Sequence, residues 1–481
     1  MLSSSPPPMA HTFARATAPA TDDDDPRKYA AAFSTGRRTY ARQFNELYYA
    51  RLNELKPHVL AAAAKKWGAD CRFTPKVLNV EAGQTAYIVG TVFIDSRAKP
   101  STLDQVEREH WISDPAVGGA YRDGAETVFL EDESGRIELV GGVVDGALLV
   151  SGLVAAVLGA ETPDGRFGVT DVCFAGMAPQ PARPAVPEDR LVALVSGLGA
   201  RAECPVTLEM QLLAEFLCGT LGSANQNDQN QDQSDRDQNS QDQNLPPVAA
   251  RIVQVVVAGN TLSLAPPPLG HTEDARANDR SGAAALVAAV DGFLADIAAA
   301  VPLALMPGAH DPADASLPQQ PMHAGMFARC AQYSGFRSLS NPALLDVGGC
   351  VLLGSSGQNV DDIARYVRPP TTPAPTHAPT PTSTPSPAAL AAESLQWRHI
   401  APSAPDTLWC YPFSGRDPFI LPLAPHVYFV GNQERPGEAA ARGADGQHTT
   451  VVAVPSFAQT HSIVLLNLRS MQCTTVRFDA K

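Results

Sequence analysis

The chain has 481 residues, of which 44% are hydrophobic and 18% charged, and its formal net charge is -14. This composition is typical of a globular protein, and the length exceeds one ordinary hydrophobic core, so two domains with additional segments are expected. The acidic balance excludes a protein that wraps nucleic acid with its whole surface, so any contact with DNA has to be local or made by a partner.

The cysteines occur singly along the chain. No two of them have the C-x-x-C spacing, which argues against a zinc ribbon or finger, and scattered thiols are typical of a reduced compartment such as cytosol or nucleus. The first residues lack the apolar core of a secretory signal, and no run of eighteen apolar residues predicts a membrane span. The eight cysteines are Cys71, Cys173, Cys204, Cys218, Cys330, Cys350, Cys410 and Cys473.

Residues 1–38 are rich in Ser, Pro, Ala and Asp and are expected to form a flexible tail. A helix is predicted after them, because apolar residues recur at helical spacing. We expect Pro57 to end or restart this helix near Lys56, with a second short helix that runs to Trp67. The apolar stripe consists of Phe44, Leu47, Tyr48, Leu55 and Val59.

The next hundred residues predict strands rich in β-branched and aromatic residues. Five or six strands in so short a stretch favour a small barrel, for which an OB-fold is a good candidate, and residues 39–180 are assigned to the N-terminal helices and this barrel. The predicted strands are KVLNV (76–80), AYIVGTVFI (86–94), TVFLE (127–131), RIELV (136–140), LVAAVLGA (153–160) and GRFGVTDVCF (165–174).

A proline-rich stretch at residues 178–189 marks a domain boundary, and residues 188–481 are assigned to a second domain. Apolar strands that end in glycines alternate there with helical segments, which predicts a layered α/β domain with loops gathered at the strand ends. The predicted strands are 191–196, 251–260, 301–308, 350–357, 426–432, 450–457 and 463–468, and the predicted helices are 206–218 and 281–300.

Two low-complexity segments interrupt the second domain. Residues 223–244 are almost entirely Asn, Gln, Asp and Ser, and residues 369–388 are almost entirely Pro, Thr, Ala and Ser. Neither can bury enough apolar surface to offset the entropy of ordering, so both are predicted to be disordered insertions.

Several segments resemble the B-subunit family of replicative DNA polymerases, and their variants resemble its delta-type members in particular. The resemblance covers almost the whole chain outside the two insertions. It is carried by TFAR (12–15), RQFNELYYARL (42–52), YIVGTVF (87–93), VSGLG (195–199), VAGN (257–260), MPGAHDPADASLPQQPMH (306–323), GSSGQNVDDIARY (354–366), RHIAPSAPDTLWCYPF (398–413) and DPFILPLAPHVYFVGN (417–432).

The resemblance implies an OB-fold barrel packed against a calcineurin-like phosphodiesterase domain, that is, an all-β part and an α/β sandwich. It further implies a non-catalytic, nuclear subunit without a cofactor. A protein of this kind connects the cysteine-rich C-terminal domain of the polymerase delta catalytic subunit to a third delta subunit during DNA replication and repair synthesis.

Active members of the phosphodiesterase fold bind two metal ions through Asp, His and Asn side chains at the strand ends, in the order D-x-H, GD, GNH[DE], a lone His and GHxH. Here neutral residues without imidazole or carboxylate groups occupy most of these positions, and we expect neither a metal nor hydrolysis. The degenerate positions are Ser196, Leu198, Asn260, Ala309, Ser356 and Asn432. The alternatives are an active metallophosphoesterase or nuclease, and an independent single-strand DNA-binding OB protein.

Two further features have both a structural and a functional interpretation. His310 and Asp311 could form an acid–base pair, but Asp311 precedes a proline and is expected to shape a turn. Between Arg27 and Lys76 there are eleven Lys or Arg and three acidic residues. This stretch could attract DNA or could be a solvated helix face or a protein contact, and we expect DNA binding to be weak or indirect.

Overall fold

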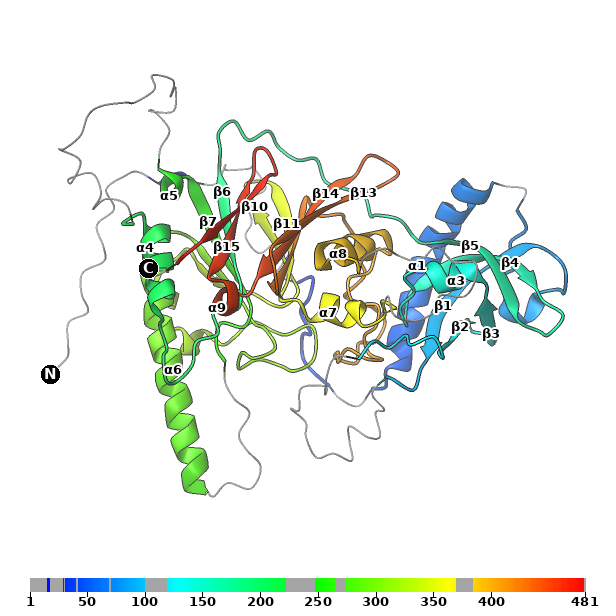
Figure 1. Cartoon of the computed structure of the whole chain (residues 1–481), viewed down its shortest axis with the longest axis horizontal. Coiled ribbons are helices and arrows are strands. Elements are labelled where there is room, and N and C mark those ends of the chain that lie inside the picture. Colours follow the sequence, from blue (N-terminus) through cyan, green and yellow to red (C-terminus); the bar gives the residue numbers. More distant parts are fainter. Residues whose placement is uncertain are drawn as a thin grey trace.

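The computed structural model of the chain (Figure 1) describes most residues in elements of regular structure. The insertion predicted at residues 223–244 lies outside the described residues, as does the other predicted insertion up to residue 383. The described ranges are 15–17, 29, 31–39, 42–68, 71–99, 119–221, 247–263, 273–368 and 384–479.

The first unit is a closed five-stranded barrel in the order β1-β2-β3-β5-β4, as the strand pattern predicts. It closes because β1 pairs with both β2 and β4, and β3 pairs with β5 in parallel. Gly159 allows β4 and β5 to approach, since a Cβ atom there would collide with the Gly168 carbonyl oxygen. The elements are β1 (Ala86–Asp95), β2 (Thr127–Glu131), β3 (Arg136–Val140), α3 (Gly142–Gly146), β4 (Val154–Glu161) and β5 (Phe167–Cys173).

The segment KVLNV is not a strand of this barrel but contains the 3-10 helix η1 (Val77–Asn79), so that prediction is wrong. Its backbone bonds to the β2–β3 turn, where Val77 N–H donates to the Asp132 carboxylate, and Leu78 remains 73% exposed. The short apolar run predicts a strand, but its hydrogen bond to the Asp132 side chain fixes a 3-10 helix instead, and the local sequence pattern does not reveal this contact.

A single helix, α1 (Asn45–Trp67), packs on the barrel. Pro57 lies inside it, and the prediction that this proline ends or restarts the helix is wrong. An interior proline costs a helix about 3 kcal/mol. Burial offsets this cost, because residues on both sides of Pro57 pack in one cluster with Val89 and Val154 of the barrel. The helix residues of that cluster are Leu52, Leu55, Val59 and Ala63.

The second unit contains two sheets that pack face to face, which confirms the mixed α/β expectation. One has six strands in the order β16-β15-β6-β7-β8-β9, and the other has five in the order β10-β11-β12-β14-β13. The strands are β6 (Leu191–Val195), β7 (Ile252–Ala258), β8 (Leu303–Met306), β9 (Phe336–Ser338), β10 (Ala343–Val347), β11 (Cys350–Ser355), β12 (Val427–Gln433), β13 (Gly437–Arg442), β14 (His448–Pro455), β15 (Ser462–Asn467) and β16 (Cys473–Arg477).

Helices cover the outer faces of the sandwich (Figure 1). A buried cluster of residues from both sheets lies between them, and the outer face of the six-stranded sheet packs on α4 and α6. The outer face of the five-stranded sheet packs on α7 and α8. The helical elements are α4 (Leu208–Cys218), α5 (Val248–Arg251), α6 (Glu273–Ala300), η3 (Ala324–Met326), η4 (Cys330–Gln332), α7 (Gln358–Ala364), α8 (Pro387–Gln396) and α9 (Phe457–Thr460).

Helix α6 contains a window, Gly282–Ala300, that is long and apolar enough by composition to cross a membrane. This is weak evidence for a span, because 44% of the window is buried and a core helix has the same properties. Its side chains Leu286, Val290 and Leu294 belong to the cluster on the six-stranded sheet. The helix therefore serves here as a core helix of the sandwich.

Two segments are ordered where the sequence predicts flexibility or disorder. Phe33 is only 2% exposed and belongs to the largest core cluster, although the composition of residues 1–38 predicts a flexible tail. Near it, Arg38 forms an ion pair with Asp314. Residues 387–388 begin helix α8, where the Ser386 side chain caps the first turn, although the sequence predicts disorder as far as residue 388.

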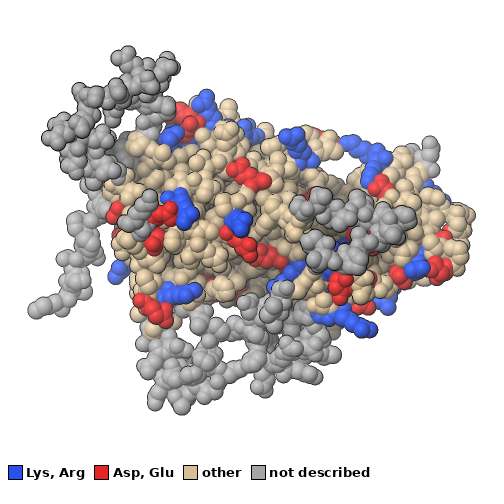
Figure 2. All heavy atoms as spheres, in the orientation of Figure 1, with Lys and Arg blue, Asp and Glu red and all other residues tan. Residues whose placement is uncertain are grey.

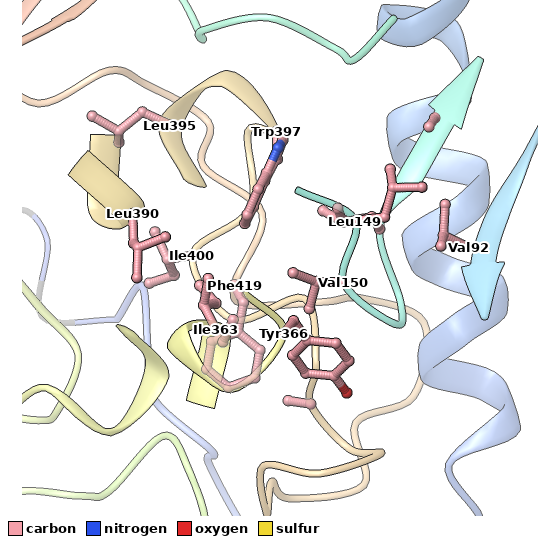
Figure 3. Packing of buried hydrophobic residues seen from close by; sticks show 14 of the residues in the cluster. Val92, Leu149, Val150, Ile363, Tyr366, Leu390, Leu395, Trp397, Ile400 and Phe419 are labelled. Carbon is pink, nitrogen blue, oxygen red and sulfur yellow. The ribbon is translucent and has the colours of Figure 1, made fainter. Parts of the chain in front are cut away.

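The barrel and the sandwich share one continuous core (Figure 3). Val92 and Leu149 come from the barrel, and Tyr366, Trp397 and Phe419 come from the sandwich. The same boundary contains a fully buried ion pair, in which Arg51 Nε lies 2.6 Å from Asp417 Oδ2. The two units are thus joined by apolar packing and by a buried charge on each side.

Replacing Arg51 with Met is expected to lower the free energy of unfolding by about 3–5 kcal/mol, because Asp417 is left buried without its cationic partner. The double substitution Arg51→Met with Asp417→Asn is expected to lose less, since neither charge then remains. Chemical denaturation followed by circular dichroism measures both values.

Arg72→Met is the matched control, because Arg72 and Glu81 form an ion pair whose side chains are 49% and 53% exposed. It is expected to change the free energy of unfolding by less than about 1 kcal/mol. An Arg51→Met protein as stable as this control would contradict the role assigned to the buried pair.

Candidate functional site

The candidate site lies where strands of both sheets end. Ser196 follows β6, Gly259 follows β7, Gly308 follows β8 and Ser356 follows β11, while Gly431 lies near the end of β12. The glycines allow the loops to touch across the sandwich, since a Cβ atom on Gly259 would lie 2.5 Å from Ser356 Cβ. Parallel strands of one sheet have their carboxyl ends at the same edge, which is why residues far apart in the chain converge here.

Asn432 links three of these loops. Its backbone N–H donates to Ser196 Oγ at 2.8 Å. Its side-chain Nδ2 donates to Ala258 O at 3.1 Å and to Ser356 O at 2.8 Å. The residue has φ of +59°, a left-handed conformation that Asn tolerates better than most residues.

Asn260 makes the corresponding link on the other side of the site. Its φ is +51°, and its Oδ1 accepts a hydrogen bond from His310 N–H at 3.0 Å. Gly308 is required beside it, because a Cβ atom there would collide with Asn260 Oδ1 and N. A side-chain amide therefore joins the loop after β7 to the loop after β8.

Asp311 completes this junction, as the turn-shaping interpretation predicts. Its carboxylate is 7% exposed and accepts hydrogen bonds from the backbone N–H groups of Thr261, Leu262 and Gly308. Burial raises the pKa of Asp311 to about 6, and these backbone hydrogen bonds oppose the rise. Its bonds go to the backbone rather than to the imidazole of His310, which is exposed, so the geometry does not form an acid–base dyad.

Sequence reasoning missed two buried amides beside Ser356. Asn341 Nδ2 donates to Gln319 Oε1 at 2.7 Å and to Ser356 Oγ at 2.8 Å. Asn341 Oδ1 in turn accepts from Ser356 N–H at 3.0 Å. The only hint in the sequence is that Asn341 precedes a proline, which is common in turns.

The other two degenerate positions lie apart from this network. Leu198 is 2% exposed and packs in the core under the six-stranded sheet. Ala309 is exposed and has no polar side-chain atom. The structure thus brings together Ser196, Asn260, Ser356 and Asn432, and it gives Leu198 a packing role instead.

The residues present do not fit a centre for two divalent cations. Such a centre needs several anionic or imidazole ligands, whereas the converging side chains are amides and hydroxyls. Asp311 is committed to three backbone N–H groups. Throughout the ranges that the structure describes, no three His, Cys, Asp or Glu side chains are grouped so that they could hold a metal ion.

The basic N-terminal stretch is the second candidate, and its charges are largely paired within the chain. Many of its Lys and Arg side chains form ion pairs, mostly with acids from distant segments. On the face shown in Figure 2, basic and acidic side chains lie intermixed. This arrangement argues against a DNA-binding surface and is compatible with both alternatives, a solvated helix face and a protein contact. The pairs are Arg38–Asp314, Arg42–Glu46, Arg51–Asp417, Lys65–Asp445, Lys66–Asp171 and Arg72–Glu81.

Comparison with known families accounts for both units. Residues 43–172 match the family described as DNA polymerase delta subunit OB-fold domain. Residues 192–438 match the family of the B subunits of DNA polymerases alpha and epsilon. An OB-fold followed by a B-subunit domain defines the class of B-type subunits of replicative DNA polymerases.

Relatives that match over nearly the whole chain show which polymerase of this class the family belongs to. The DNA polymerase delta small subunit of Arabidopsis thaliana is 35% identical over 441 residues, which cover 92% of each chain. DNA polymerase delta subunit 2 of Drosophila melanogaster is 32% identical over 92% of this chain and 94% of its own. The small subunit of Saccharomyces cerevisiae is 30% identical over 92% of this chain and 91% of its own. The chain belongs to the family of DNA polymerase delta small subunits.

Asn432→Gly is expected to lower the free energy of unfolding by about 1–3 kcal/mol, because Ala258 O and Ser356 O lose their amide donor. Asn432→Ala is expected to lose about 1 kcal/mol more, since alanine disfavours the left-handed backbone conformation. Chemical denaturation measures the two differences. Gln332→Ala, at an exposed side chain, is the control, and an Asn432→Gly protein equal to it would contradict a cross-linking role.

Proposed function

We propose that this chain is the non-catalytic small subunit of DNA polymerase delta and acts in DNA replication and repair synthesis. The names of relatives that match over nine-tenths of both chains support the assignment to this polymerase. The observation that carries the non-catalytic role is the candidate site, where neutral amides and hydroxyls converge on the strand ends.

The fold of the second unit is proposed to be a calcineurin-like phosphodiesterase sandwich with a degenerate site. Two sheets with a shared core, helices on their outer faces and loops that meet at the carboxyl ends of parallel strands support this proposal. The four converging positions are those at which an active member would have metal ligands. Ser196, Ser356 and Asn432 are hydrogen-bonded to one another, and Asn260 is bonded to the loop after β8, so these loops are held together without a metal.

The role is proposed to be a scaffold in the nucleus. The chain would hold the cysteine-rich C-terminal domain of the catalytic subunit and a third delta subunit. Large apolar side chains that stay exposed in the isolated chain support a protein-binding role, among them Tyr49 at 64%, Phe44 at 41% and Trp409 at 39%. The rigid junction of barrel and sandwich would present them in a fixed arrangement.

Two alternative functions remain open to experiment. An active metallophosphoesterase or nuclease would need ligands that the converging residues do not provide. An independent single-strand DNA binder would show binding that falls steeply with salt, and the internal pairing of the basic stretch argues against it.

Co-expression with the C-terminal domain of a delta-type catalytic subunit is expected to give a monodisperse complex, whereas the chain alone is expected to be poorly soluble or oligomeric. Exposed apolar surface becomes buried in such an interface. Size-exclusion chromatography with light scattering measures the masses, with the corresponding domain of an alpha-type catalytic subunit as the control. A stable monomer that does not bind the delta-type domain at micromolar concentration would sink the proposal.

The purified chain is expected to contain less than one metal ion per molecule and to show no metal-dependent hydrolysis of phosphodiesters. Neutral side chains cannot balance the charge of two divalent cations. Elemental analysis and a nuclease assay with added Mn²⁺ test this expectation. His310→Ala distinguishes a contaminant from real activity, because activity of the chain itself would fall in that variant.

A further inference from the structure

Residues 15–17, which begin with the last residue of the TFAR motif, lie against the sandwich far from the candidate site. Arg15 Nη1 donates to Ala249 O at 2.7 Å and to Ile252 O at 3.2 Å, and Nη2 donates to Leu217 O at 2.7 Å. The neighbouring Ala16 N–H donates to Ala250 O at 2.8 Å. The segment is therefore attached by one side chain and by its backbone.

Three of the four acceptors are carbonyl groups in short or terminal helical turns, and the fourth, Ile252 O, belongs to the first residue of strand β7. Leu217 lies in the last turn of α4, and Ala249 and Ala250 belong to the four-residue helix α5. The last carbonyls of a helix have no partner within the helix, and they form the negative end of its dipole. A cation with several N–H donors complements such a cluster better than a neutral side chain does.

The residues that provide these carbonyls are firmly placed. Leu217 and Ile252 have no exposed surface, and Ala249 and Ala250 are 6% and 2% exposed. Burial among them lowers the pKa of the Arg15 guanidinium, although it remains a cation. The four carbonyl groups are thus held in place by buried residues of the fold.

We propose that these four carbonyl groups form an arginine-specific peptide-binding site, which Arg15 and Ala16 occupy in the same chain. We call it the arginine socket, defined by the carbonyl groups of Leu217, Ala249, Ala250 and Ile252. Its ligand class is an extended peptide with an arginine followed by a small residue. The proposal does not rest on the proposed role in the polymerase, because it is argued from the contacts of Arg15 and Ala16 alone.

The arginine socket lies where the two ends of an insertion meet. It joins the end of α4 to α5 and the start of β7, which are the two ends of the insertion that contains residues 223–244. Holding the ends of a long loop together opposes the entropy of loop closure. Arg15 therefore links the two ends of this insertion, and a peptide that contains residues 15 and 16 should be able to replace it in trans.

The experiment uses the full chain with Arg15→Ala, Arg15→Lys and, as a matched control, Arg477→Ala, whose ion pair with Asp479 is exposed. Hydrogen exchange of the amides between residues 247 and 254 is followed by mass spectrometry. Arg15→Ala is expected to exchange at least about tenfold faster there, since charge-assisted hydrogen bonds contribute more than about 1.4 kcal/mol. Arg15→Lys should lie in between, because a lysine cannot reach carbonyls in two directions.

A synthetic peptide with the sequence of residues 9–22 is then added to the Arg15→Ala protein. The peptide is expected to restore slow exchange, and the same peptide with alanine in place of its arginine is expected to bind at least about tenfold more weakly. If Arg15→Ala does not fold, the titration is made with Arg15→Lys. Unchanged exchange in both variants, or equal effects of the two peptides, would overturn the proposal.

Discussion

A guanidinium with no exposed surface needs an acceptor for its N–H groups, and Arg51 finds acceptors in three parts of the chain. From helix α1 it reaches Asp417 in the sandwich and Gly152 O in the barrel. It also donates to Pro402 O and Ala404 O, both at 2.6 Å. Because a buried charge that loses its partners is strongly unfavourable, the positions of helix, barrel and sandwich become mutually dependent.

Other residues at the junction provide the close approach and the hydrogen bonds that the buried Arg51–Asp417 ion pair needs. Gly152 has φ of +86°, and a side chain there would collide with Pro402 O, so only glycine lets the barrel approach. His399 Nδ1 accepts from Ala401 N–H at 3.2 Å, so its Nε2 carries the proton and donates to Asp417. Burial lowers the pKa of His399, so this ring is neutral. The charge of Arg51, together with the hydrogen bonds from His399 and Arg51, holds the pKa of Asp417 well below its usual range despite burial. The carboxylate is thus ionised, paired and fully hydrogen-bonded.

The strands and main helices could be predicted because their patterns are local. The barrel strands β1 to β5 and the sandwich strands β6, β7 and β12 follow from periodicity and β-branched residues. The strands β9, β10, β13 and β16 were missed. All four are edge strands, and each is held by pairing with one neighbouring strand rather than by a strong apolar pattern of its own. Pro57 misled the prediction of helix α1 because its cost is offset by packing on the barrel, which the helix sequence does not encode.

In the candidate site, too, the positions of the residues could be predicted from the sequence, but their contacts could not. The motif positions placed six candidate residues at strand ends. Leu198 packs in the core and Ala309 is exposed, whereas the structure brings Ser196, Asn260, Ser356 and Asn432 together. What these residues do there depended on partners that have no motif, such as the backbone carbonyl of Ala258. The docking of Arg15 was hidden for the same reason, because its acceptors are carbonyl groups, which every residue has.

The side-chain amide of Asn260 also affects whether the candidate site could bind a metal cation. Gly308 N–H donates to Asp311, and the space for a Cβ atom on Gly308 is closed by Asn260 Oδ1, so the side chains of Asn260 and Asp311 lie on either side of this glycine. Asp311 already ionises reluctantly, with a pKa of about 6 because it is buried. A second carboxylate at position 260 would raise the cost of ionising either group unless a cation came with it. A cation would need further ligands at positions 196, 356 and 432, where hydroxyl and amide groups now bind the neighbouring backbone. A single substitution at one of these positions would therefore not create a metal site, and it would weaken the contacts that hold the loops together.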